Sequence, residues 1–317
     1  MTKMKTWLSA LLAAQLALAI GFYWNTQQEL QKGLPKPLVN IDWQKVDHFV
    51  VGDDKQRVAL SHSKDGWLLS ELGMLPTVDG NAEQLLEKLK ALQTSWPVAS
   101  TKESHARFDV TDDKLHRFVA FYHGDKLLGK LIVGSSPGLK KLHVRMDSQD
   151  NVYTVDLELV DMITTEQAWL DNTLLMTDKL VSIQGSDYTL SKQGESWALQ
   201  TQASGTESQE LDSSKVGDML YALKGLRVRK LVTEMPDLAG SGYAQLSVET
   251  TESGSPLIYQ FYMTKENCYV TRNDYDAMFT IDWGDYEKIA AMDAEKLTVQ
   301  PEVNQESSPE ETGSAQS

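Results

Sequence analysis

The phrase "LSHSKDGWLLSE" at residues 60–71 is repeated 130 residues further on as "LSKQGESWALQT" at residues 190–201. In both copies a Leu-Ser pair precedes a polar segment containing Gly and an acid, and a Trp (Trp67 or Trp197) then begins an apolar run. Polar turn residues between two runs of alternating apolar positions are typical of a β-hairpin. The chain therefore contains one hairpin unit twice, and we expect each Trp to anchor a sheet against the helix that follows.

The repeated unit includes an amphipathic helix after each hairpin. Residues 81–93 and 213–226 carry apolar side chains at the i, i+3, i+4, i+7 spacing of a helix that buries one face. These positions are Ala82, Leu85, Leu86, Leu89 and Leu92 in the first copy, and Val216, Met219, Leu220, Leu223 and Leu226 in the second. Asp79 and Asp212 lie where the N-caps of these helices are expected.

Alternating apolar runs, typical of short strands, surround the hairpin and the helix in both copies. They lie at 46–51, 116–122, 126–134, 141–146 and 152–156 in the first copy, and at 179–184, 244–250, 257–263, 268–272 and 278–282 in the second. The pattern predicts an α+β fold of two tandem repeats, each an antiparallel β-meander with one amphipathic helix. We expect the two repeat domains at residues 41–175 and 176–298, and a disordered acidic tail at 299–317.

The N-terminus carries the signal of a membrane anchor. No charged residue occurs from Trp7 to Trp24, and two lysines precede this run. Eighteen such residues can span the hydrocarbon core of a bilayer as a helix. We therefore predict a single transmembrane helix within residues 1–24, with its N-terminus in the cytoplasm, and a polar stalk at residues 25–40. A signal peptide cleaved after Ala19 is the alternative, and under both readings the bulk of the chain is exported.

Composition excludes some classes of function. The formal net charge of −15 argues against binding of nucleic acid, which is driven by clustered Lys and Arg. The single cysteine, Cys268, excludes an internal disulfide and a metal site built from several cysteines. Its apolar surroundings predict a small buried hydrophobic side chain in a strand.

No pattern of residues predicts a catalytic, metal or cofactor site. The six histidines lack the spacing of zinc ligands. The segment at 133–141, "VGSSPGLKK", lacks the spacing of a phosphate-binding loop, and we expect a turn there. The segment at 272–278, "RNDYDAM", lacks the late Glu of a calcium loop and is likewise expected to form a turn.

Two short basic segments are unusual in so acidic a chain. The first basic segment contains Lys140, Lys141 and Arg145, and the second contains Arg227, Arg229 and Lys230. Such clusters are candidates for docking an acidic partner or lipid headgroups. The alternative is that they are the solvated edges of strands, kept from aggregating by their charge.

The order of these features resembles the bacterial family of the domain of unknown function 4340. The resemblance is carried by Trp67 and the helix after it, Phe108-Asp109-Val110, the strand ending at Gly134, the segment ending at Arg145, "VYTVD" at 152–156 and "AWLDNTLL" at 168–175. Members commonly have a Gly within a "yGLd" segment where this chain reads "RFDV". The resemblance implies a protein anchored in the bacterial inner membrane and facing the periplasm, often linked with ABC-transporter permeases and auxiliary subunits, and it implies no reaction.

The sequence thus favours a periplasmic accessory or scaffold protein that binds partners and is no enzyme. Two alternatives stay open. One is an extracytoplasmic enzyme that acts on envelope glycans or lipids, and the other is a structural envelope protein that works without a transporter.

Overall fold

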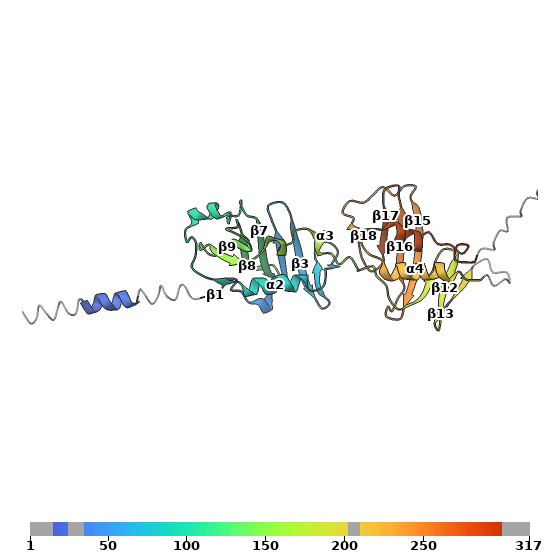
Figure 1. Cartoon of the computed structure of the whole chain (residues 1–317), viewed down its shortest axis with the longest axis horizontal. Helices are drawn as coiled ribbons and strands as arrows, with labels where there is room; N and C mark the ends of the chain where they lie inside the picture. Colours follow the sequence, from blue (N-terminus) through green and yellow to red (C-terminus); the bar gives the residue numbers. More distant parts are fainter. Residues whose placement is uncertain (1–14, 25–34, 202–209, 300–317) are drawn as a thin grey trace, which may run out of the picture. The chain divides into compact units, whose positions relative to one another are not determined.

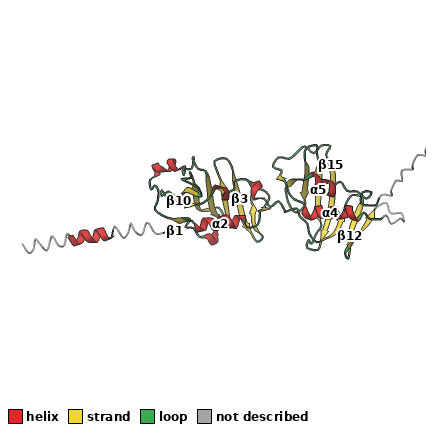
Figure 2. Cartoon of the chain, in the orientation of Figure 1, coloured by secondary structure: helices red, strands yellow, loops and turns green. Residues whose placement is uncertain are grey.

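In a computed structural model, the chain is described over residues 15–24, 35–201 and 210–299. It divides into two compact units between Asp171 and Asn172. Both units consist of antiparallel strands with few helices, as Figure 1 and Figure 2 show. The prediction of an α+β fold built on antiparallel sheets is confirmed.

The first unit contains an eight-stranded antiparallel sheet with the order β10-β9-β8-β7-β2-β3-β4-β5. Its strands are β2 (His48–Gly52), β3 (Arg57–Ser63), β4 (Gly66–Leu69), β5 (Leu75–Pro76), β7 (Arg117–His123), β8 (Lys126–Val133), β9 (Lys141–Met146) and β10 (Tyr153–Asp156). A separate two-stranded sheet joins β1 (Lys36–Pro37) to β6 (Gln93–Thr94). Because side chains alternate along a strand, every second one lies on the buried face, as Val58 and Leu60 do in β3.

The second unit contains another eight-stranded antiparallel sheet, with the order β13-β12-β11-β15-β16-β17-β18-β14. Its strands are β11 (Leu180–Gln184), β12 (Tyr188–Gln193), β13 (Ser196–Thr201), β14 (Lys230–Leu231), β15 (Gly242–Thr250), β16 (Leu257–Met263), β17 (Cys268–Arg272) and β18 (Met278–Ile281). In each sheet, seven neighbouring strands follow the same order. The order β4-β3-β2-β7-β8-β9-β10 in the first sheet is matched by β13-β12-β11-β15-β16-β17-β18 in the second.

A longer helix covers one face of each sheet. The bounds predicted for these two helices agree with the structure to within two residues. They are α2 (Asn81–Ala91) and α4 (Ser213–Gly225), labelled in Figure 1. The Asp212 carboxylate accepts hydrogen bonds from the N–H groups of Ser214 and Lys215, so the predicted cap of α4 is confirmed. The predicted cap of α2 is wrong, because the N-cap of α2 is Gly80, which has a φ of 78° and no side chain that could accept such a bond.

The remaining helices are short. They are α3 (Glu166–Trp169) and α5 (Trp283–Ile289), with 3-10 segments at Trp43–Lys45, Lys102–Phe108 and Leu159–Asp161. In the first unit, Trp169 and Trp67 are both buried, and their rings contact Phe49 edge-on at centroid distances of 6.4 and 4.8 Å. Trp197 lies half-buried on the edge strand β13, so the repeated Trp is a core residue in the first unit only.

Residues 15–24 form a helical segment with exposed side chains. The rest of the predicted membrane span lies outside the described residues. Within the described ranges, no helix combines the length and the apolar composition needed to cross a bilayer. Most of the predicted stalk and nearly all of the predicted acidic tail likewise fall outside the described residues.

Candidate docking groove

A groove of about 730 Å³ lies in the first unit, beside the last strand of the sheet. One wall is the end of α2 with β6, and the other is β10 with the residues that follow it. Leu92, Val155 and Leu157 are buried and form an apolar floor. Lysines and carboxylates from several segments surround this floor.

Three ion pairs lie among the residues that line the groove, and one of them, Lys88–Asp161, joins its two walls. Lys88 Nζ lies 2.6 Å from an Asp161 oxygen, Lys140 Nζ lies 3.4 Å from Glu158, and Lys141 Nζ lies 3.3 Å from Asp156. The lysine side chains are 52%, 69% and 54% exposed, respectively. Exposed pairs of this kind contribute at most about 1 kcal/mol each. A partner's carboxylates can therefore replace the chain's own acids at little cost.

The turn before β9 holds Lys140 in an unfavourable conformation. Lys140 has a φ of 57°, in the left-handed region that favours glycine. The Ser136 hydroxyl is 2.7 Å from the Gly138 carbonyl oxygen and 2.8 Å from that of Lys141, and the Leu157 N–H donates to the Lys140 carbonyl. Non-glycine residues in this region cost about 1 kcal/mol or more and cluster at functional sites. The backbone strain at Lys140 therefore supports the groove as a candidate functional site.

The structure separates the predicted residues of the first basic segment. Lys140 and Lys141 line the groove, whereas Arg145 is only 6% exposed. The Arg145 guanidinium donates hydrogen bonds to the carbonyl oxygens of Val110, Asp147 and Gln149, at 3.0, 3.2 and 3.2 Å. Arg145 thus fixes two loops of the first unit, and we leave it out of the docking surface.

The second basic segment belongs to the second unit. Arg227 and Arg229 are exposed on either side of the buried Val228. Arg227 donates a 3.2 Å hydrogen bond to the Asn172 side chain, and Arg229 forms an ion pair with Asp282. The side-chain hydrogen bond from Arg229 holds the pKa of Asp282 below its usual value. Lys230 is exposed on β14, and none of these three residues lines the groove.

The Phe108-Asp109-Val110 segment lies directly against Gly134. A Cβ atom at Gly134 would lie 2.1 Å from the Phe108 carbonyl oxygen, so only glycine allows this approach. Asp109 has a φ of 58°, which explains why a glycine would suit this position and why Asp, which tolerates the left-handed region, can replace it. Hydrogen bonding to Lys114, above all other interactions, lowers the pKa of the Asp109 carboxyl.

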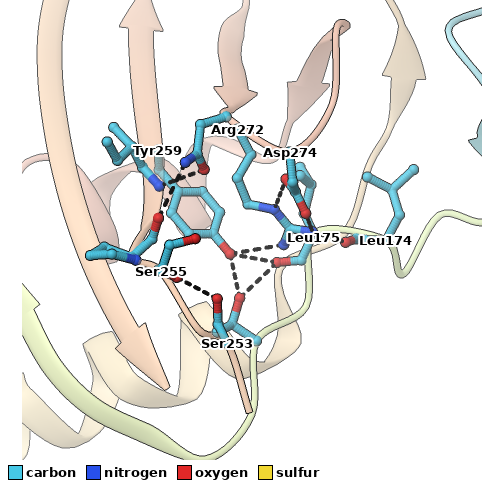
Figure 3. A network of polar contacts seen from close by, with 11 residues as sticks. Leu174, Leu175, Ser253, Ser255, Tyr259, Arg272 and Asp274 are labelled. Carbon is cyan, nitrogen blue, oxygen red and sulfur yellow. Dashed lines mark hydrogen bonds and ion pairs between the residues drawn. The ribbon is translucent and has the colours of Figure 1, made fainter. Parts of the chain in front are cut away.

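Sequence reasoning missed a buried polar network around Arg272, shown in Figure 3. The Arg272 guanidinium binds both carboxylate oxygens of Asp274 at 2.7 and 2.8 Å. It also donates to the Tyr259 hydroxyl at 3.1 Å and to the Leu174 carbonyl at 2.8 Å. Burial lowers the pKa of Arg272, but the bonds to Asp274 and Tyr259 outweigh burial and raise that pKa above its usual value.

This network is structural. It fixes the first residues of the second unit to β16 and β17, because the Tyr259 hydroxyl also donates to the Leu175 carbonyl and contacts the Thr177 hydroxyl. One feature of the sequence indicates this network. Cys268, Val270 and Arg272 alternate along β17, which places an arginine on the same face as two buried side chains.

The charged groups that line the groove form ion pairs within the chain. The groove's lysines are exposed and are paired with Asp161, Glu158 and Asp156, of which Asp161 is half-buried. Within the described ranges, no group of three or more His, Cys, Asp and Glu side chains is placed to hold a metal ion.

Comparison with known proteins places the chain in one family. Residues 36–255 match the family model described as domain of unknown function DUF4340, which is well over half of the 317 residues. No curated protein and no solved structure matches the chain. The match covers the first unit with its groove and the second unit as far as the turn after β15. The chain therefore belongs to the DUF4340 family.

Proposed function

We propose that this protein is a periplasmic accessory or scaffold protein, anchored in the bacterial inner membrane, that binds a protein partner and catalyses no reaction. The observation that carries the proposal is the groove between α2 and β10. Its rim consists of exposed ion pairs that a partner can exchange, and its floor is apolar. A small apolar floor with a charged rim is the usual anatomy of a protein-binding surface.

The anchor rests on the sequence. The uncharged run from Trp7 to Trp24, with lysines before it, supports a single transmembrane helix with the remaining chain outside the cytoplasm. Such a helix would hold the groove near the membrane surface, where subunits of a membrane complex are within reach. The two units share a strand order. We propose that they are duplicated copies of one scaffold module.

The partner is proposed to be a subunit of an ABC-transporter or another envelope complex that offers an acidic segment. Lys88 comes from α2, Lys140 and Lys141 are adjacent at the start of β9, and all three line the same groove. Carboxylates of a partner would take the place of Asp161, Glu158 and Asp156 on these lysines. Glu158 and Asp156, once released, are exposed and regain water, whereas the Asp161 side chain is 21% exposed and regains less.

Copurification from membranes tests this function. The tagged full-length chain is extracted in mild detergent, and the proteins bound to it are identified by mass spectrometry. The double variant Lys140→Glu, Lys141→Glu is expected to lose the membrane subunits that the unaltered chain recovers, by about tenfold or more.

The double variant Lys55→Glu, Lys64→Glu is the matched control. It changes the charge of the first unit by the same amount at two exposed lysines away from the groove. Equal recovery of partners by all three chains would show that the groove docks no protein. Recovery of lipid alone, lost in the groove variant, would make the groove a lipid-binding surface.

A further inference from the structure

Strand β15 extends well beyond its neighbour β11 in the second sheet. The two strands pair only from Leu180↔Thr250 to Gln184↔Ser247. Residues 242–246 of β15 continue past this point and pair with β16 on their other side. In the first unit, β2 covers nearly all of the corresponding strand β7, from residue 118 to residue 122. The overhang therefore distinguishes the second unit from the first.

The overhang leaves backbone groups directed at an open edge. The Thr251 N–H donates to the Lys179 carbonyl, so residue 251 directs its backbone groups toward β11. Because these groups alternate along a strand, those of Gln245 and Tyr243 are directed toward the same side. Within the described residues, no hydrogen-bond partner lies there for the N–H or C=O group of Gln245 or Tyr243.

A groove of about 470 Å³ lies along this edge. Its lining includes the turn from Gln184 to Ser186 and residues 290–293 after α5. Five residues of a strand span about 17 Å, which is the length of the overhang. Tyr243 lines the groove and is 55% exposed, and its ring is tilted by 50° against that of Tyr262, with centroids 5.3 Å apart.

The charges around the groove are acidic. Its lining contains Asp293 and no lysine or arginine. Asp187 lies next to the lining turn, and its carboxylate accepts the Ala294 N–H. Lys296 Nζ lies 3.5 Å from an Asp293 oxygen, and this ammonium group also donates to the Ala291 carbonyl. A ligand with its own Lys or Arg would meet complementary charge here.

We propose that this edge binds an extended peptide segment carrying Lys or Arg, which adds to the second sheet as a strand beside Tyr243–Gln245. Backbone hydrogen bonds to β15 supply the affinity, and the acidic rim selects basic side chains. The site is separate from the groove of the first unit and takes a partner of opposite charge. One chain could thus hold two different partner segments, as a scaffold requires.

Binding of a synthetic peptide to the full-length chain in detergent tests the proposal. The probe is a labelled seven-residue peptide of alternating Thr and Val with Lys at both ends, followed by fluorescence anisotropy. Methylation of alternate backbone nitrogens of the peptide, which blocks strand pairing, is expected to weaken binding about tenfold or more. Replacing both lysines by Glu is expected to weaken binding to a similar extent.

Two variants of the chain complete the test. Gln245→Pro removes the N–H that faces the open edge and leaves the bonds between β15 and β16 in place, because those involve residues 244 and 246. Its affinity is expected to fall about tenfold. Gln245→Ala removes only the side chain, and its affinity is expected to stay within about threefold of that of the unaltered chain.

Three outcomes overturn the proposal: no saturable binding of the basic peptide up to about 1 mM, equal binding of the methylated peptide, or equal binding of the Glu peptide. If Gln245→Pro does not fold, the binding of the methylated peptide to the unaltered chain still tests the proposal. A chain truncated after residue 299 that binds the peptide ten times more tightly would show that the chain's own C-terminal residues hold the edge. The Lys140→Glu, Lys141→Glu variant should bind the peptide unchanged, which separates this result from that of the first groove.

Discussion

Replacing Arg272 by Leu is expected to destabilise the second unit severely. The substitution removes two bonds to the Asp274 carboxylate, one to the Tyr259 hydroxyl and one to the Leu174 carbonyl. Tyr259 keeps its contacts with Thr177 and Leu175, but the Leu174 carbonyl loses its charged donor inside the unit.

The size of the effect follows from the burial of each group. Removing one member of a buried ion pair costs about 3–5 kcal/mol. The Asp274 side chain is 39% exposed, so water can take up part of its lost bonding, and the cost lies at the lower end of that range. An expected loss of about 3 kcal/mol corresponds to a melting temperature about 10 °C lower for a unit of this size.

Differential scanning calorimetry of the chain without its first 34 residues can measure this loss in the second unit. Arg227→Leu is the matched control, since Arg227 is exposed and makes one 3.2 Å bond to Asn172. Its effect should stay within about 0.5 kcal/mol. A free energy of unfolding for Arg272→Leu within about 1 kcal/mol of the unaltered chain would refute the structural role of the network.

Three further predictions concern the first unit and the N-terminus. Gly134→Ala should destabilise the first unit by about 2 kcal/mol or more in urea unfolding, because its Cβ would lie 2.1 Å from the Phe108 carbonyl oxygen, whereas Gly138→Ala, with open space around it, should change little. Asp53→Asn should lower stability at pH 7 and flatten its acid dependence. Burial raises the pKa of Asp53, but backbone bonds from Lys55 and Gln56, with Thr164 and Arg117, lower it below 3.8 overall. The stabilisation is therefore present above an unfolded pKa of about 3.9 and is lost as the pH falls through the lower folded value, so the stabilities of the variant and the unaltered chain should converge in urea titrations as the pH falls below that folded value. Equal acid dependence of the two would contradict this origin of the pKa shift. A reporter that is active only outside the cytoplasm should be active when fused to the C-terminus, and intact mass should show no mature start near Ile20; activity of a cytoplasmic reporter would exclude the proposed topology.

Much of the fold could be predicted from local pattern. The periodicity of apolar residues placed α2 and α4 within two residues, and alternation placed the long strands, because both depend on neighbours in sequence. The N-cap of α2 could not be predicted, since an acid at Asp79 and a glycine at Gly80 both suit a helix N-terminus. Cys268 is buried in β17, as predicted.

The candidate sites depend on long-range packing and were only partly predictable. Lys140 and Lys141 stood out as a charge cluster, but Lys88 and Asp161 join them only because α2 and the segment after β10 meet in space. Arg145 has the same charge as Lys140 and Lys141. Its burial depends on the carbonyl groups of residues 110, 147 and 149, which accept its hydrogen bonds. The open edge at Tyr243 depends on where β11 ends, which the pattern of β15 cannot reveal.

Photo-crosslinking from the groove in intact membranes tests the central claim most directly. A photoreactive residue replaces Thr154, which lines the groove, and in a control chain it replaces Lys64, an exposed residue outside the groove. The account predicts an adduct with one membrane-complex subunit from position 154 and none from position 64. Equal adducts from both positions, or adducts with lipid alone at position 154, would contradict it.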